Sequence, residues 1–235
     1  MDPLTRLASE PARAALFLDV DGVLAPIVPR PEDARVPDET RARLGALVPR
    51  YGLVACVTGR DTETARRVVG VDGLTIAGEH GLELEPAARA WVESIHAFAA
   101  AAAWPWTETK PLSAAFHFRQ APDHDAAHEE LERVRLGAAE LGFKTRWGRM
   151  VLEVLPPVEA TKGTAVGHLL RESGLKRALY AGDDTTDLDG FAALEGLELA
   201  VRVAVLSPDG PEELARRADV VVDSPAAFLD LLRRL

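Results

Sequence analysis

Two aspartates stand two positions apart at the end of an apolar run near the start of the chain. The stretch ALFLDVDGVL covers residues 15 to 24 and places Asp19 and Asp21 after residues typical of a buried strand. Ligands of open α/β sheets bind outside the carboxyl ends of the strands, so polar residues at such an end need a chemical reason. Asp19 could attack a phosphorus atom, and Asp21 could protonate the leaving oxygen.

Similar junctions occur at three later points of the chain. Thr58 and Gly59 follow the apolar run LVACV, and Lys162 lies in the first turn of a helical pattern. An acidic cluster follows LYAG and consists of Asp183, Asp184 and Asp187. Carboxylates that lie close together repel each other unless a cation neutralises them, and oxygen-only ligands favour Mg²⁺. The sequence therefore predicts a Mg²⁺ site if the fold brings the two acidic clusters together.

An alternation of strands and helices would position these residues. Short apolar runs such as AALFLD and LVACVTG are followed by helical patterns, which indicates an α/β fold with a parallel sheet. Asp61 is a natural N-cap for one helix, and Gly70 and Gly174 are natural ends for two. Ser224 and Pro225 open the last helix.

The middle of the chain has a different pattern. Between residues 82 and 158, strand-like runs such as LSAAFHFR and MVLEVLP alternate with two long helical patterns. We therefore expect an α+β module at 82–158, inserted into an α/β core formed by residues 1–81 and 159–235.

Composition excludes several classes of protein. The 235 residues are 47% hydrophobic and 27% charged, and the formal net charge of -10 includes no basic run, so neither nucleic acid nor a membrane is an expected partner. The single cysteine, Cys56, lies in an apolar run and fits a reducing compartment. No apolar run approaches membrane-spanning length, and the N-terminus lacks a secretory pattern. We expect a cytoplasmic monomer that binds a small molecule.

Four motifs in order resemble those of the haloacid dehalogenase (HAD) superfamily of phosphotransferases: DVDGV, TGR, a lysine that opens a later helix, and GDDTTD. The insertion between the second and third motifs resembles the larger cap of the sugar-phosphatase branch. Further segments, including AGEHGLELE, ETKPLSAAFHFRQAP and GRMVLEVLPP, resemble the trehalose-6-phosphate phosphatase family over nearly the whole chain. The resemblance implies a Rossmann-like HAD core with an α+β cap, and a Mg²⁺-dependent phosphatase that hydrolyses trehalose 6-phosphate through an aspartyl-phosphate.

The resemblance also implies roles for the core residues, position by position. Asp19 would be the nucleophile, and Asp21 the general acid and then the general base. Thr58 and the amide of Gly59 would hold phosphate oxygens. Lys162 would neutralise both Asp19 and the phosphoryl group.

The same resemblance places the metal ligands at the carboxylates of Asp19 and Asp183 and the main-chain carbonyl of Asp21. Asp184 and Asp187 would act through bound water or by orienting Lys162. Leu188 and Gly190 depart from the family, which usually has an acidic residue and a methionine there.

In the cap, the resemblance places sugar contacts at Glu108, Lys110 and Glu153, and less directly at Arg119, His117 and His80. Plainer interpretations stay open at this stage. Glu153 could face solvent, Lys110 and Glu108 could form an ordinary surface pair, and DVDG alone could be a strand that leads into a turn.

Two other functions compete with this prediction. The same chemistry could act on another sugar or disaccharide phosphate, which only the cap could distinguish. Alternatively, the chain could be a non-catalytic regulator that binds a sugar phosphate. The presence of both Asp19 and Asp21 argues against the regulator, because binding alone needs no nucleophile and acid pair.

Overall fold

The computed structural model describes residues 2–148, 150–207 and 210–235, which divide into two compact units. One unit joins residues 1–84 to residues 160–235, and the other comprises residues 85–159. The proposed role of the second unit as a substrate-selecting cap stays a prediction.

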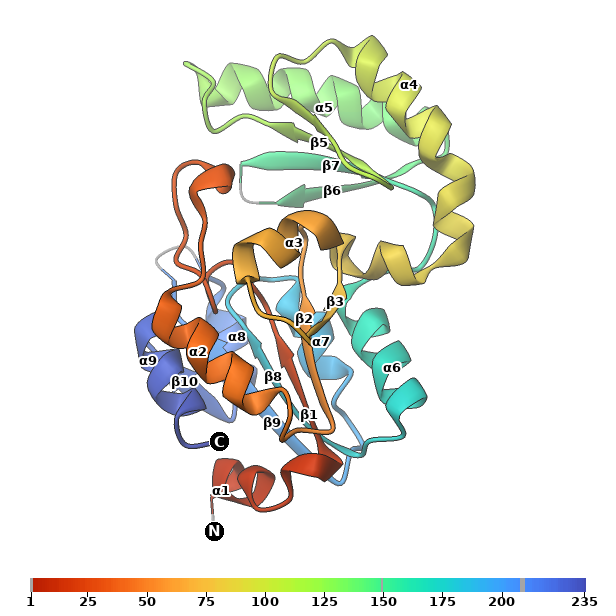
Figure 1. Cartoon of the computed structure of the whole chain (residues 1–235). Helices are drawn as coiled ribbons and strands as arrows, with labels where there is room; N and C mark the ends of the chain where they lie inside the picture. Colours follow the sequence, from red (N-terminus) through yellow and green to blue (C-terminus); the bar gives the residue numbers. More distant parts are fainter. Residues whose placement is uncertain (1, 149, 208–209) are drawn as a thin grey trace. The chain divides into compact units, whose positions relative to one another are not determined.

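The first unit contains a sheet of six parallel strands in the order β10-β9-β8-β1-β2-β3 (Figure 1). Its strands are β1 (Ala14–Leu18), β2 (Leu53–Val57), β3 (Thr75–Ala77), β8 (Arg177–Gly182), β9 (Leu199–Val205) and β10 (Val220–Val222). From β1 the chain builds outward through β2 and β3 on one side, and it returns to β8 on the other side. The strand order thus reverses between β1 and β8, and in such sheets ligands bind outside the carboxyl ends of the strands at this point.

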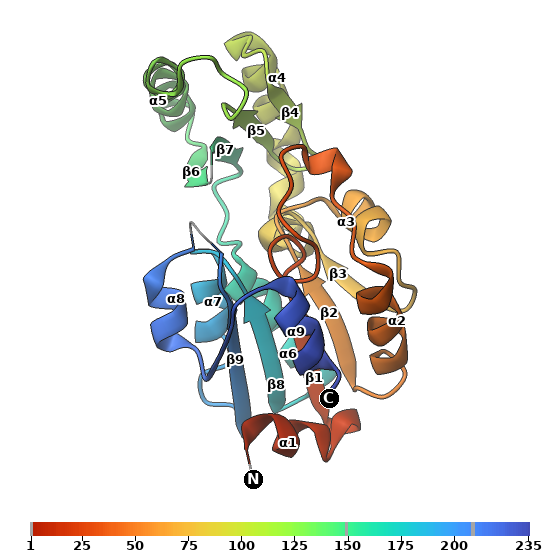
Figure 2. The ribbon, with the colours of Figure 1, turned by 90° about the vertical axis from the view of Figure 1, so that its left-hand side faces the viewer.

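Helices cover both faces of this sheet (Figure 2). One face packs against α1 (Pro3–Ala8), α2 (Asp38–Leu47), α3 (Thr62–Val69) and α9 (Pro225–Leu232), and the other against α6 (Lys162–Ser173), α7 (Asp187–Ala192) and α8 (Glu212–Arg217). Side chains of β1 point alternately to the two faces of the sheet, so both faces bury apolar residues. Leu16 and Leu18 pack in the core on the first face, and Ala15 and Phe17 pack in the core on the other. The predicted parallel α/β fold is confirmed. Among the described helices, none is long and apolar enough to cross a membrane.

The predicted helix ends are confirmed as well. The side chain of Asp61 accepts a hydrogen bond from the amide of Thr64 at the start of α3, and that of Ser224 accepts one from Ala227 at the start of α9. Gly70 ends α3 with φ of 62°, a left-handed conformation that glycine adopts without strain. Short 3₁₀ helices connect other elements at Pro11–Arg13, Pro31–Asp33 and Glu79–Leu84.

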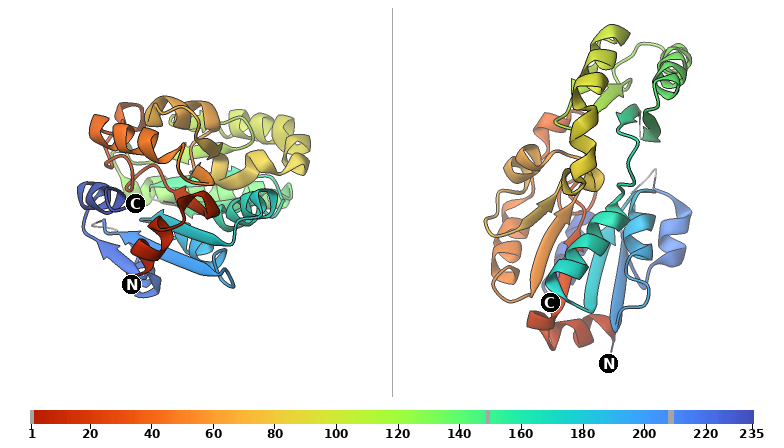
Figure 3. Two further views of the ribbon diagram at one scale, coloured as in Figure 1. Left: turned by 60° about the horizontal axis from the view of Figure 1, so that its bottom comes forward. Right: turned by 90° about the vertical axis from the view of Figure 1, so that its right-hand side faces the viewer.

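The two ends of the chain lie in this same unit (Figure 3). Asp2 caps α1 by accepting hydrogen bonds from the amides of Leu4 and Thr5. Its carboxylate also pairs with Arg234 at 3.3 Å, which links the first helix to the end of the chain.

The second unit is built on an antiparallel sheet in the order β4-β5-β7-β6. Its elements are a 3₁₀ helix (Pro86–Trp91), α4 (Val92–Ala102), β4 (Thr107–Thr109), β5 (Ala114–His117), α5 (His124–Glu140), β6 (Lys144–Gly148) and β7 (Val151–Leu155). Phe116 and Leu152 pack against Ile95 of α4 and Leu131 of α5. Alternate residues of the same strands project from the opposite face, which includes Glu108, Arg146 and Glu153 and which we call the charged face.

Candidate active site

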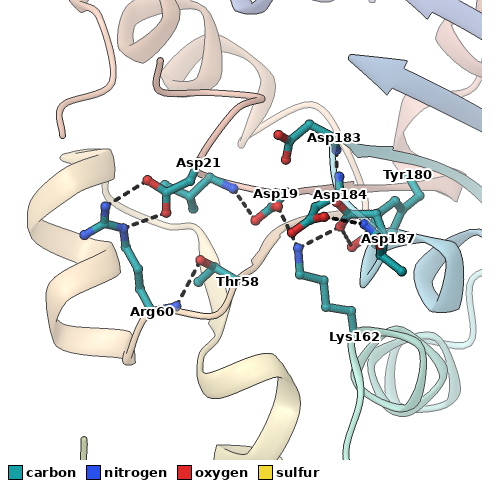
Figure 4. Close-up of polar contacts among 11 residues, drawn as sticks. Asp19, Asp21, Thr58, Arg60, Lys162, Tyr180, Asp183, Asp184 and Asp187 are labelled. Carbon is teal, nitrogen blue, oxygen red and sulfur yellow. Dashed lines mark hydrogen bonds and ion pairs between the residues drawn. The ribbon is translucent and has the colours of Figure 1, made fainter. Parts of the chain in front are cut away.

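Asp19, Lys162 and Asp187 form a buried charged cluster beside the carboxyl ends of β1 and β8 (Figure 4). The ammonium of Lys162 donates to Asp19 Oδ2 at 2.6 Å and to Asp187 Oδ1 at 2.7 Å. Lys162 is 2% exposed, because it enters from the first turn of α6, which packs on the sheet. Residues 143 positions apart in the sequence thus meet at one edge of the sheet.

Asp187 is held by hydrogen bonds on both of its carboxylate oxygens. Oδ1 accepts from Lys162 and from the hydroxyl of Tyr180, at 2.7 Å each, and Oδ2 accepts from the amides of Asp183 and Asp184 at 2.9 Å each. Four donors use the roughly four lone-pair sites of a carboxylate. Asp187 therefore contacts both the Lys162 ammonium and the main chain of the loop that carries Asp183.

The charges of this cluster do not balance. Burial raises the pKa of Asp19 well above its usual value, in spite of the ammonium of Lys162, and Asp187 and Asp183 add to the increase. Burial opposes the charge of Lys162, but the carboxylates of Asp187 and Asp19 outweigh it and raise its pKa, so the amine stays protonated.

A divalent cation fits the remaining negative charge. Carboxylate oxygens of Asp19, Asp183 and Asp187 lie within 4.8 Å of one another, and all three residues are buried. Asp187 is already held by four donors, so Asp19 and Asp183 are the better-placed ligands. Oxygen-only donors at this density suit Mg²⁺.

Gly22 allows the close approach of Asp183 to the loop after β1. Its φ is 81°, and a Cβ atom at this position would lie 2.2 Å from Asp183 Oδ2. Any side chain here would displace the Asp183 carboxylate, which explains the glycine of DVDG in physical terms.

Asp21 lies next to the cluster, but its carboxylate points away from Asp19 and toward Arg60 (Figure 4). Arg60 donates two hydrogen bonds to it, from Nε at 2.7 Å and from Nη2 at 2.8 Å. The motif TGR by itself assigns no role to its arginine. Only the fold shows that Arg60, after β2, reaches the loop after β1.

The predicted phosphate-binding loop follows β2. Thr58 is 1% exposed, and its hydroxyl oxygen accepts a hydrogen bond from the amide of Arg60 at 3.2 Å. A Cβ atom on Gly59 would lie 2.5 Å from His80 Nε2, so the imidazole ring packs directly on this glycine. The structure therefore places His80 beside this loop, within the predicted bounds of the core.

Asp184 makes its contacts within its own loop. Its amide donates to Asp187, and its carboxylate accepts from the amide of Thr185 at 2.7 Å. Of the two residues predicted to orient Lys162, Asp187 contacts it directly.

In the second unit, one row of residues crosses all four strands on the charged face. The register pairs Glu108 with Ala115, Ala115 with Glu153, and Glu153 with Arg146. Lys110 pairs with Glu153 Oε1 at 3.2 Å, and Arg146 Nε donates to Glu153 Oε2 at 2.9 Å. Glu153 is only 7% exposed, so the interpretation that it faces solvent is wrong.

The other cap candidates are more exposed. His117 Nε2 lies 2.8 Å from Glu108 Oε2, and Lys110 Nζ lies 3.2 Å from Glu153 Oε1. Arg119 follows β5 and is exposed, and its carbonyl lies 3.3 Å from His124 Nε2.

Three residues of these clusters were missed from the sequence: Arg60, Arg146 and Tyr180. The alternation within KTRW and MVLEVL was a usable signal for Arg146, because it places this residue and Glu153 on the same face of neighbouring strands. For Tyr180, an apolar strand such as RALYAG gives no sign that a hydroxyl meets a carboxylate.

Comparisons with known proteins agree with this architecture. The family model described as Trehalose-phosphatase matches residues 17–107 and 105–220. A probable trehalose-phosphate phosphatase of Sinorhizobium fredii is 33% identical over 218 residues, which cover 86% of this chain and 82% of that protein. A Mycobacterium tuberculosis protein, "Uncharacterized glycosyl hydrolase Rv2006", is 34% identical over 215 residues, and the chain spans only 16% of its length.

Solved structures show the same fold. The C-terminal domain of Candida albicans trehalose-6-phosphate phosphatase superposes with a TM-score of 0.77 at 22% identity, and the match covers 97% of this chain and 93% of that one. A haloacid dehalogenase-like hydrolase of Bacteroides thetaiotaomicron gives a TM-score of 0.67 at 13% identity, with 94% and 98% covered. At these identities the structures establish the HAD fold, and the family model establishes the family. This chain belongs to the trehalose-phosphatase family.

Proposed function

We propose that the chain hydrolyses trehalose 6-phosphate to trehalose and phosphate, with Mg²⁺ and an aspartyl-phosphate on Asp19. The observation that carries the proposal is the buried Asp19–Lys162–Asp187 cluster beside Asp183 in a member of the trehalose-phosphatase family. A buried cluster of three carboxylates and one ammonium is costly for packing alone, and it suits a site for a metal and a phosphoryl group.

In the first step, a carboxylate oxygen of Asp19 attacks phosphorus. The bond from phosphorus to the sugar oxygen breaks, and that oxygen takes a proton from Asp21. In the second step, water attacks the phosphoryl group and gives its proton to Asp21. Phosphate leaves, and Asp19 is again a free carboxylate.

The surrounding residues hold the charge of the phosphoryl group. Lys162 neutralises Asp19 and a phosphoryl oxygen, and Thr58 and the Gly59 amide donate hydrogen bonds to other oxygens. Asp19, Asp183 and the carbonyl of Asp21 would hold Mg²⁺. The cation supplies the positive charge that lets an anionic phosphate approach an anionic nucleophile.

Arg60 holds the Asp21 carboxylate turned away from Asp19 through the two hydrogen bonds that it donates. A general acid must carry a proton and must reach the leaving oxygen. We therefore propose that the Asp21 side chain leaves Arg60 and rotates toward Asp19 when substrate binds.

The charged face of the second unit would bind the sugar that carries no phosphate. Glu153 is held between Lys110 and Arg146, so its oxygens and the Lys110 ammonium are fixed in position. Glu108 lies on β4 and Arg119 follows β5, and both are more exposed. Fixed charged groups of this kind bind sugar hydroxyls with little loss of side-chain entropy.

A screen of sugar phosphates with Mg²⁺ tests the proposed function. We expect the highest kcat/KM on trehalose 6-phosphate among disaccharide and hexose phosphates. A higher kcat/KM on sucrose phosphate or on a hexose phosphate would show that this other sugar phosphate is the substrate. Tight binding of a sugar phosphate without hydrolysis would favour the regulator.

Removal of the metal is expected to abolish hydrolysis. Excess chelator should stop turnover, Mg²⁺ should restore it, and Ca²⁺ should restore it poorly because its larger, looser coordination misplaces the phosphate. The measurement is the steady-state rate before and after each addition. Full activity in excess chelator would exclude a metal-dependent site.

Substitutions on the charged face should act on sugar recognition. Removing one charge-assisted hydrogen bond costs on the order of 1.5–3 kcal/mol, so Glu108→Gln, Lys110→Met and Glu153→Gln should each lower kcat/KM on trehalose 6-phosphate about ten- to a hundredfold. Hydrolysis of a small aryl phosphate should hardly change. Glu129→Gln, at an exposed position of α5, is the matched control. Equal losses on both substrates would mean that these residues support the fold or the catalytic centre.

A further inference from the structure

Tyr180 carries a polar group in the buried interior of the first unit. It is 0% exposed and heads the fully buried side chains when the described residues are ranked by volume. Its ring meets Phe191 edge to face, with the centroids 5.9 Å apart and the planes at 86°. Phenylalanine would fill this space without the cost of removing a hydroxyl from water, so packing alone does not explain the tyrosine.

Among the residues that the structure describes, the hydroxyl has one hydrogen-bond partner, and that partner is Asp187 of the buried charged cluster. It donates to Asp187 Oδ1 at 2.7 Å, the same oxygen that accepts from Lys162 Nζ at 2.7 Å. The other donors to Asp187 are main-chain amides, which bind Oδ2. Tyr180 is thus the side chain that shares the oxygen contacted by Lys162.

Because Tyr180 and Lys162 share this oxygen, the hydroxyl affects how strongly Lys162 binds Asp187 relative to Asp19. Two donors that share one acceptor oxygen compete for its electron density, so an oxygen that already accepts from a phenol is a weaker acceptor for the ammonium. The hydroxyl therefore limits the attraction of Asp187 for Lys162 and leaves the ammonium close to Asp19, at 2.6 Å. Without the hydroxyl, Lys162 is drawn toward Asp187 and away from the nucleophile.

Gly190 leaves the space that the Tyr180 ring occupies. A Cβ atom on Gly190 would lie 2.3 Å from Tyr180 Cε2, so a larger residue on α7 would push the ring out of position. Gly190 is one of the two departures from the family pattern in the last motif, and the position of the Tyr180 ring gives it a physical reason.

We propose that Tyr180 is a positioning residue, which acts through Asp187 to hold Lys162 beside Asp19. The effect on turnover rests on the proposed function, whereas the effect on Lys162 does not. Because Lys162 neutralises charge that develops during phosphoryl transfer, its displacement should lower kcat more than it changes KM.

The test compares Tyr180→Phe with Tyr51→Phe. Tyr51 is the other tyrosine of the chain, is 6% exposed, and donates a hydrogen bond from its hydroxyl to the carbonyl of Leu235 at 3.3 Å. The control variant therefore also loses a buried, hydrogen-bonded hydroxyl. We expect Tyr180→Phe to lower kcat about five- to thirtyfold with KM within about twofold of the parent value. Tyr51→Phe should leave both constants unchanged.

A second readout does not require any phosphatase activity. The chain has four lysines, Lys110, Lys144, Lys162 and Lys176, so protein labelled with ¹³C at lysine Cε gives a spectrum of four resolvable signals. Tyr180→Phe should shift the Lys162 signal alone, and Tyr51→Phe should shift none. If the parent hydrolyses no sugar phosphate, the proposed function fails while this measurement still decides the position of Lys162.

A third probe covers the case in which Tyr180→Phe does not fold. Growth on 3-fluorotyrosine in a Tyr51→Phe background labels position 180 alone and strengthens the phenol as a donor, so the Lys162 signal should again shift. An unchanged Lys162 signal in the folded variant or with the fluorinated ring, or an unchanged kcat in folded Tyr180→Phe, would overturn the proposal.

Discussion

Asp19→Asn is expected to reduce turnover to the background rate while the protein stays folded. Asparagine keeps the shape of the side chain but lacks the charge and the free oxygen that attack phosphorus. Asp19 lies with Asp183 and Asp187 in one buried group, and burial raises the pKa of Asp19. Removing the charge of Asp19 also removes its repulsion with Asp187 and Asp183. The free energy of unfolding of the metal-free variant should therefore be close to that of the parent.

The measurement for Asp19→Asn is kcat on trehalose 6-phosphate and on an aryl phosphate, together with a denaturant unfolding curve. Asp72→Asn, at an exposed loop position, controls for the loss of one negative charge and should behave as the parent. Appreciable turnover by folded Asp19→Asn on either substrate would reject covalent catalysis by Asp19.

Lys162→Met is expected to remove both activity and stability. The methionine fills a similar volume, but it leaves Asp19 and Asp187 buried without the ammonium that both contact. Breaking a buried pair by removing one partner typically costs about 3–5 kcal/mol. The variant should also lose turnover, because no side chain then neutralises Asp19 and the phosphoryl group.

Lys176→Met is the matched control for Lys162→Met, since Lys176 is exposed on the same unit and its loss should change neither property. Unfolding curves without metal measure the stability of each variant. A loss no greater than that of Lys176→Met would show that Lys162 does not neutralise the buried carboxylates in the folded protein.

The arrangement of the core followed from local patterns in the sequence. The apolar run that ends at Leu18 predicted a buried strand, and a parallel sheet brings the carboxyl ends of β1, β2 and β8 to one edge. The helix that begins at Lys162 was visible from its cap and its period. These features depend on neighbours in the sequence, which is why they could be predicted.

Contacts between distant side chains could not be predicted in this way. The pairing of Arg60 with Asp21 joins residues 39 positions apart, and it depends on the rotamers of two side chains on separate loops. The Tyr180 hydroxyl is hidden in an apolar strand, and its role depends on where α7 places Asp187. The burial of Glu153 depends on Lys110 and Arg146, which flank it from other strands.

Reductive trapping during turnover tests the central claim most directly. Borohydride converts an aspartyl-phosphate into homoserine, so protein quenched while it hydrolyses trehalose 6-phosphate with Mg²⁺ should carry homoserine at position 19 in peptide mass spectra. The modification should be absent without substrate and in Asp19→Asn. Full turnover with no homoserine at position 19, or with homoserine at Asp21 or Asp183 instead, would contradict the account.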